Sequence, residues 1–147
     1  MPWELADRLK AETKPLIVDV REPQEFVAMH IPGSINVPRG ILESACDYGY
    51  AETLPELATG REREIVLVCR SGNRSALAAQ VLRLLGYRRP ATLMTGVRGW
   101  NDYDQPLHNA KGETVDPDEA ERYLNPPIAA EQMKPAEQAR PATVKDR

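Results

Sequence analysis

Short apolar runs alternate along the chain with segments in which apolar residues recur at helical spacing. The runs predict buried strands, because aliphatic and β-branched residues without polar interruption suit a sheet covered on both faces. We place the strands at 16–20, 34–37, 64–69 and 91–94, and helices at 3–10, 22–29 and 74–85. Strands that alternate with helices favour parallel pairing. The pattern therefore predicts an α/β fold: a central, mostly parallel sheet of about five strands with helices on both faces.

A change in composition after Leu107 marks the end of this pattern. Residues 108–147 carry 5 of the 13 prolines, are rich in charge and contain few large apolar side chains. Such a segment cannot offset its ordering entropy with a core of its own. We therefore predict a domain over residues 1–107 and an extended or partly disordered C-terminal tail over 108–147. Within the tail we expect a short helix at 117–124, capped by Asp116 and with Pro117 in its first turn.

Charge and composition argue against several classes of function. A net charge of −3 and a pI of about 5.5 provide no basic field for nucleic acid. No apolar run reaches the roughly 18 residues of a membrane span. The first residues lack a secretory signal, so we expect a cytoplasmic protein without membrane contact. Two cysteines, Cys46 and Cys69, with no CxxC pair and no Cys/His cluster, predict neither a disulfide scaffold nor a structural metal site.

One loop concentrates residues suited to catalysis. Cys69 ends the clearest predicted strand, and Cys69-Arg70-Ser71-Gly72-Asn73-Arg74-Ser75 leads into the clearest predicted helix. Backbone N–H groups of a tight loop before a helix converge on an anion, and the helix N-terminus adds positive potential. Gly72 permits the turn, and the two arginines add charge. These features predict a thiolate nucleophile at Cys69. The alternative is a buried strand-end cysteine beside solvated arginines.

Further motifs follow in a fixed order around this loop. They are LIVDVRE at 16–22 followed by Glu25-Phe26, HIPGSINVP at 30–38, then Gly86-Tyr87, Gly96, Trp100 and Pro106-Leu107. Together with the loop at 69–75, they resemble the rhodanese family, the single-domain sulfurtransferases, over roughly residues 3–107. The resemblance implies a rhodanese-like fold.

The resemblance also implies a reaction. The family's catalytic cysteine corresponds to Cys69, and the residues from Arg70 to Ser75 correspond to the loop that binds sulfur and the donor anion. The thiolate would take the outer sulfur of thiosulfate, or of a persulfide donor, and hold it as a persulfide. The sulfur would then pass to cyanide, a thiol or a sulfur carrier protein. No metal or organic cofactor is implied. The physiological donor, the acceptor and the oligomeric state stay open.

Two other functions are weighed against sulfur transfer. Phosphatases and arsenate reductases that resemble this fold place five residues between the cysteine and the arginine of the loop. Four residues separate Cys69 from Arg74 here, and the narrower loop favours sulfur. A rhodanese-like domain can also be a non-enzymatic binding module, which the intact Cys69 disfavours. Thr95-Gly96 stands where many members have two glycines.

Several other polar residues near the predicted site receive structural roles. Asp19 is expected to tie down the chain after its strand, and Arg21 to pair with Glu25 one helical turn on. His30 is predicted to be a hydrogen-bonded structural histidine, and Trp100 to pack in the core. The segment 39–60, which contains Cys46, is a candidate for the entrance of the site.

Overall fold

A sheet of four parallel strands forms the centre of the computed structural model, which describes residues 1–135. The strands are β1 (Leu16–Asp19), β2 (Ile35–Asn36), β3 (Glu64–Val68) and β4 (Arg89–Thr92), in the order β2-β1-β3-β4. Asp19 is in register with Asn36 on one side and Val68 on the other, so three strands end at a common edge. The predicted α/β fold is confirmed, with four strands described where about five were expected.

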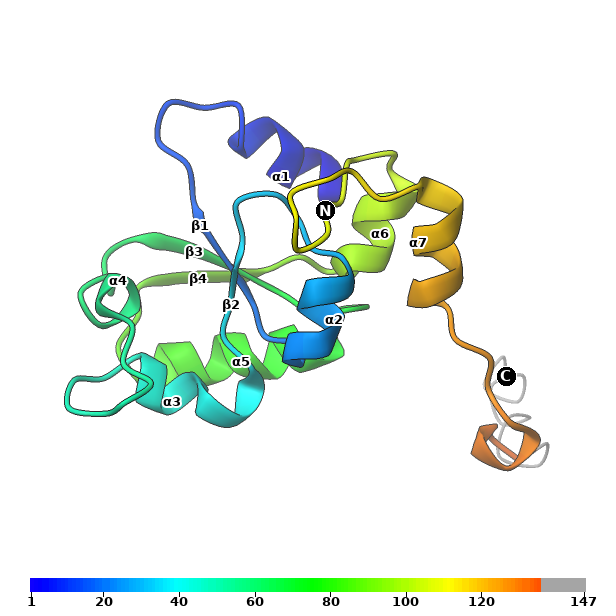
Figure 1. The fold of residues 1–147 in the computed structure, drawn as a ribbon. Helices are drawn as coiled ribbons and strands as arrows, with labels where there is room; N and C mark the ends of the chain where they lie inside the picture. The colour runs from blue at the N-terminus through cyan, green and yellow to red at the C-terminus, as the bar shows by residue number, and fades with distance from the viewer. Residues whose placement is uncertain (136–147) are drawn as a thin grey trace, which may run out of the picture.

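Helices cover both faces of the sheet, with α3 and α5 on one face and α1, α6 and α7 on the other (Figure 1). The helices are α1 (Pro2–Arg8), α2 (Pro23–Ala28), α3 (Leu42–Ala45), α4 (Pro55–Ala58), α5 (Asn73–Leu84), α6 (Gly96–Asp102) and α7 (Pro117–Leu124), with short 3₁₀ turns at Arg39–Ile41 and Ala130–Gln132. None of the helices in the described part of the chain is long and apolar enough to span a membrane.

Successive residues of the central strands point into two separate hydrophobic cores. In β1, Leu16 and Val18 join the core beneath α5, whereas Ile17 joins the core beneath α1 and α6. In β3, Leu67 and Val66 divide in the same way. This follows from the two-residue period of a strand, which sends neighbouring side chains to opposite faces. Each aliphatic side chain buried in this way contributes about 1.5–3 kcal/mol, so the two cores fix the sheet between its helices.

The packed domain continues past residue 107 as far as Leu124. His108 pairs with His30 through backbone hydrogen bonds, and α7 packs against α6 with Ala120 and Leu124 fully buried. The predicted helix at 117–124 is confirmed, and Asp116 caps it by accepting a hydrogen bond from the Glu119 N–H at 3.0 Å. Residues 108–124 thus complete the core beneath α6 and need no core of their own. Residues 125–135 are exposed, and the rest of the predicted tail lies outside the described residues.

Candidate active site

Cys69 directly follows β3 at the common edge where the strands end, and α5 begins four residues later. Its side chain is only 1% exposed. A buried parallel strand followed by a loop and a helix is the place where open α/β sheets bind ligands. The sequence-based position of the nucleophile therefore coincides with the edge of the sheet at which ligands are expected.

Gly72 turns the loop so that it faces the Cys69 sulfur. The Gly72 N–H donates a hydrogen bond to Cys69 Sγ at 3.0 Å. The backbone here has φ of +108°, and a Cβ atom would lie 2.1 Å from the carbonyl oxygen of Met94. Both the left-handed conformation and this close approach require glycine. The predicted role of Gly72 in the turn thus has two physical causes.

Helix α6 holds the outer side of the same loop. The Val97 N–H donates to the Cys69 carbonyl at 2.9 Å, and the Arg98 N–H donates to the Arg70 carbonyl at 3.0 Å. Gly96 makes this contact possible, because a Cβ atom there would lie 2.4 Å from the Arg70 carbonyl oxygen. With their carbonyls bound by α6, the loop peptides present their N–H groups to the sulfur. No sequence pattern indicated that α6 would supply these donors.

The pKa of the Cys69 thiol is below its ordinary value. Burial raises this pKa, but hydrogen bonds from the Ser75 hydroxyl and from the backbone N–H groups of Ser75, Gly72 and Ser71 lower it further than burial raises it. The hydrogen bonds of the loop lower this pKa, whereas the sequence argument relied on the arginine charges as well.

Ser75 and Thr92 form a hydroxyl pair beneath the nucleophile. Ser75 is fully buried, and its Oγ lies 3.5 Å from Cys69 Sγ and 2.6 Å from Thr92 Oγ1. In the structure the Cys69 thiol donates to Ser75 Oγ, and the Ser75 hydroxyl donates to the Gly72 carbonyl oxygen at 3.2 Å. When the thiol loses its proton, the Ser75 hydroxyl can turn its own proton to the sulfur while Thr92 donates to Ser75 Oγ. The sequence analysis did not identify Thr92. Its position at the end of β4, the strand next to β3, could have indicated that it lies near Cys69.

Arg74 has a carboxylate partner and does not extend freely toward an anion. Its two terminal nitrogens donate to the two oxygens of Glu25 at 2.8 and 3.0 Å, joining α5 to α2. Arg74 was predicted to shape the anion site. The separate prediction that Glu25 pairs with Arg21 is wrong, because Glu25 pairs with Arg74. The pKa of Glu25 is lowered: burial raises it, but the hydrogen bonds from Arg74 and from the Glu22 N–H, together with the charges of Arg74 and Arg21, more than compensate.

Arg21 pairs with Asp19 beneath the site. Its Nε lies 3.0 Å from one carboxylate oxygen and its Nη2 lies 2.8 Å from the other, and Nη2 also donates to the Met29 carbonyl at 2.6 Å. Both side chains are almost fully buried. Asn36 adds hydrogen bonds to the carbonyls of both residues. Asp19 fixes the chain after β1, as expected, but Arg21 does so by pairing with Asp19 and not with the predicted Glu25.

The remaining loop residues are more exposed than Cys69. Arg70 is half-buried, and its Nε has no hydrogen-bond partner within the described structure. Asn73 is exposed, and none of the described hydrogen bonds involves its side chain. Ser71 is half-buried and lines a hollow of about 360 Å³ together with Thr95 and Arg98. The structure therefore brings the backbone of the predicted loop together but disperses several of its side chains.

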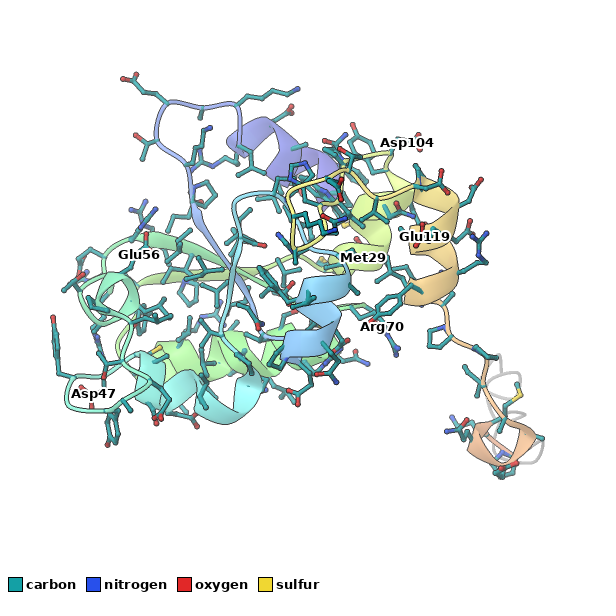
Figure 2. All side chains as sticks on the ribbon, in the orientation of Figure 1. Met29, Asp47, Glu56, Arg70, Asp104 and Glu119 are labelled. Carbon is teal, nitrogen blue, oxygen red and sulfur yellow. The ribbon has the colours of Figure 1, made fainter. Side chains whose placement is uncertain are left out.

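Other residues singled out from the sequence lie away from the nucleophile. Figure 2 shows Asp47 and Glu56, both in the segment 39–60, far to the left of Arg70. The expectation that this segment forms the entrance is wrong except at Arg39, which donates to the Arg74 carbonyl at 3.3 Å. Cys46 is buried and is not in a disulfide.

Two aromatic residues have the roles predicted for them. His30 Nδ1 lies 2.8 Å from the carbonyl oxygen of Phe26, as expected for a structural histidine. Trp100 is buried in the core, and its indole N–H donates to the Pro106 carbonyl.

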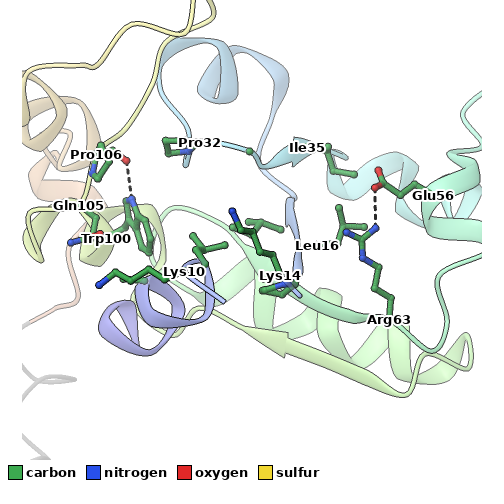
Figure 3. Close-up of a pocket in the computed structure, with 15 residues that line it drawn as sticks. Lys10, Lys14, Leu16, Pro32, Ile35, Glu56, Arg63, Trp100, Gln105 and Pro106 are labelled. Atoms are coloured by element: carbon green, nitrogen blue, oxygen red, sulfur yellow. Dashed lines mark hydrogen bonds and ion pairs between the residues drawn. The ribbon is translucent and has the colours of Figure 1, made fainter. Parts of the chain in front are cut away.

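Another hollow, of about 550 Å³, is at the other edge of the sheet (Figure 3). Leu16 and Ile17, at the start of β1, line this hollow together with Lys14. None of the residues that line it belongs to the loop at 69–75, so it is not part of the Cys69 site. Within residues 1–135, no group of three or more metal-ligating side chains gathers into a metal site.

Comparison with known proteins identifies the family. The model of the rhodanese-like domain matches residues 1–103. The chain is 30% identical over 100 residues to the adenylyltransferase and sulfurtransferase uba4 of Ogataea parapolymorpha. This match covers 68% of this chain and 23% of that protein. The fold is similar to the human single-domain sulfurtransferase TSTD1, with a TM-score of 0.60, 31% identity and coverage of 67% of this chain and 90% of that chain.

A further solved relative is the thiosulfate sulfurtransferase of Pseudomonas aeruginosa. Its TM-score is 0.61 at 26% identity, with coverage of 84% of this chain and 22% of that one. The chain thus spans less than a quarter of this relative and of uba4. The match of the family model over residues 1–103 shows that the chain belongs to the rhodanese-like domain family.

Proposed function

We propose that this protein is a sulfurtransferase that carries sulfur as a persulfide on Cys69. The observation that carries the proposal is the set of donors around one sulfur atom: the Gly72 N–H at 3.0 Å, the other loop N–H groups and the Ser75 hydroxyl. This arrangement stabilises a negative charge on Cys69, which both nucleophilic attack and departure of the thiolate require. The names of the sulfurtransferase relatives support the same chemistry.

In the first step, the Cys69 thiolate attacks the outer sulfur of thiosulfate. A bond forms between Cys69 Sγ and that sulfur, and the bond to the sulfonate sulfur breaks. Sulfite leaves with the electron pair, and the persulfide anion remains in the loop. Arg70 is the residue we assign to the oxyanion, because it flanks the nucleophile and is half-buried, and none of the described hydrogen bonds or ion pairs engages its guanidinium group. A persulfide donor would react in the same way, with a thiolate as the leaving group.

In the second step, an acceptor takes the outer sulfur and Cys69 leaves as a thiolate. Cyanide and thiols are suitable acceptors because both are thiophilic nucleophiles. The donors that stabilised the attacking thiolate also stabilise it as a leaving group, so one loop serves both steps. None of these steps involves a metal ion or an organic cofactor.

The structure favours this reaction over phosphate or arsenate chemistry. Four residues separate Cys69 from Arg74, and the Arg74 guanidinium is engaged by both oxygens of Glu25. An oxyanion would have to compete with this carboxylate for Arg74. We therefore expect little hydrolysis of p-nitrophenyl phosphate, and hydrolysis that depends on Cys69 would revive the phosphatase alternative.

The test is the intact mass of the protein after brief incubation with thiosulfate. We expect the wild-type protein to gain about 32 Da, the mass of one sulfur, and to lose it on reduction or on addition of cyanide. Cys69→Ser should gain nothing, whereas Cys46→Ala should gain the same mass as wild type. If a folded wild-type protein gains no sulfur from thiosulfate or from a protein persulfide, the proposal is refuted in favour of a binding module.

A further inference from the structure

Three large apolar side chains are exposed around the hollow beside the Cys69 loop. Trp3, Met94 and Tyr103 are 45%, 66% and 44% exposed. All three line the hollow of about 360 Å³ that also contains Ser71 of the loop. We call this feature the aromatic hollow. Neither thiosulfate nor cyanide has an apolar group that would cover these side chains.

The aromatic hollow is built by elements that also shape the active-site loop. Met94 follows β4, and its carbonyl oxygen is the atom against which Gly72 packs. Tyr103 caps the end of α6, the helix that binds the loop carbonyls, and its ring lies 5.9 Å from that of Trp3 on α1. The hollow is therefore fixed relative to Cys69.

The polar wall of the aromatic hollow suits a peptide backbone. Arg98 and Asp102 both line it, and no ion pair within the described residues engages either of them. Thr95 also lines this wall, but its hydroxyl oxygen is buried against Gly99 and is not offered to a ligand. A guanidinium group can donate to peptide carbonyls, and a carboxylate can accept from peptide N–H groups. Both kinds of backbone group can therefore be satisfied beside the apolar side chains.

The loaded form brings the reacting atom closer to the surface. Cys69 is 1% exposed, so a bulky thiol does not reach its Sγ directly. In the persulfide, the outer sulfur is about 2 Å beyond Sγ, the length of an S–S bond. A partner bound in the aromatic hollow beside Ser71 would need to present its thiol only to this outer atom.

We propose that the aromatic hollow binds the peptide segment around an acceptor cysteine of a partner protein, and that this segment has an apolar side chain next to the cysteine. The inference rests on the proposed sulfur transfer and names its acceptor class. The acceptor thiolate attacks the outer sulfur of the Cys69 persulfide, and the bond from that sulfur to Cys69 Sγ breaks. Cys69 leaves as a thiolate and the acceptor becomes the persulfide, with no net oxidation or reduction. Contiguous exposed apolar surface beside a reactive group is typical of such a contact.

The test compares two acceptor peptides, Ac-Phe-Cys-Phe-amide and Ac-Ser-Cys-Ser-amide. The full chain is loaded with thiosulfate and desalted, and loss of the added sulfur is followed by intact mass. Cyanide serves as the reference acceptor in every variant. We expect the phenylalanine peptide to react about tenfold faster than the serine peptide, since partial burial of one ring supplies a factor of this size. A double variant, Trp3→Ala with Tyr103→Ala, should lower the ratio of the phenylalanine-peptide rate to the cyanide rate by about tenfold.

A matched control is available in a second pair of exposed aromatic residues. Tyr48 and Tyr50 are 61% and 55% exposed in the segment far from Arg70, so Tyr48→Ala with Tyr50→Ala should leave the ratio unchanged. If the Trp3 variant fails to fold, Met94→Ala tests the same surface, because only an exposed side chain is removed. Equal rates for the two peptides, or a preference that survives in the folded variants, would overturn the inference. Failure of thiosulfate and of a persulfide donor to load Cys69 would overturn the proposed function with it.

Discussion

Replacing Ser75 with alanine tests whether hydrogen bonding, rather than arginine charge, makes Cys69 a thiolate. The Ser75 hydroxyl lies 3.5 Å from Cys69 Sγ and is held there by Thr92 at 2.6 Å. A hydrogen bond to a charged group contributes about 1.5–3 kcal/mol. The long distance to sulfur places this one at the lower end, which corresponds to roughly a tenfold change in an equilibrium. Because Ser75 is fully buried, bulk water does not replace the lost donor.

We therefore expect the thiolate population of Ser75→Ala, at pH values below the Cys69 pKa, to fall about tenfold. The assay is the rate of alkylation by iodoacetamide as a function of pH, followed by intact mass. Cys46 does not interfere, because burial raises the pKa of its thiol. The rates of wild type and variant should converge at high pH, where the Cys69 thiol is ionised in both proteins.

Ser34→Ala is the matched control, since the Ser34 hydroxyl donates to the Ile31 carbonyl and not to Cys69. An unchanged pH profile in Ser75→Ala would refute the reasoning. The arginine charges would then be the better explanation of the lowered Cys69 pKa. The same change in Ser34→Ala would show that the effect is not specific to the donor at Cys69.

Three further predictions concern the elements that support the site. The pKa of Glu25 lies below its ordinary value of 4.5, so the Glu25–Arg74 pair stabilises the fold above that pH and loses its effect as the pH falls through the lowered value. Urea unfolding at about pH 6 and about pH 3 should therefore show a smaller loss of stability for Glu25→Gln than for wild type, and equal losses would contradict the pairing. Gly96→Ala should slow sulfur loading at least tenfold by displacing the loop, whereas Gly112→Ala, also at positive φ but with nothing within 4 Å, should load normally. Leu124→Ala should lower the free energy of unfolding by about 2–5 kcal/mol, because Leu124 is buried in the core beneath α6. Its control is the exposed Tyr123→Ala, and an equally small cost for both would show that α7 does not pack on the domain in solution.

The nucleophile and its loop could be predicted because their interactions are local in sequence. Cys69 and the N–H groups that face it lie within seven residues, and a strand followed directly by a loop and a helix brings them together in any such fold. The same holds for α7, whose cap and first turn lie in adjacent residues, Asp116 and Pro117. The alternation of short apolar runs with helical segments likewise predicted the parallel sheet, since a strand buried on both faces needs a helix on each side.

The partners of the polar side chains were decided by the tertiary structure. Arg74 lies 49 residues from Glu25, and Ser75 lies 17 residues from Thr92, so no local pattern couples them. The contact of α6 with the loop and the packing of α7 on α6 are also long-range, and the aromatic hollow joins residues from α1, from α6 and from the turn after β4. The sequence by itself determined where the reactive sulfur lies, because backbone geometry near a strand end is set locally. Which charges surround that sulfur, and which surface lies beside it, depended on how distant elements pack together.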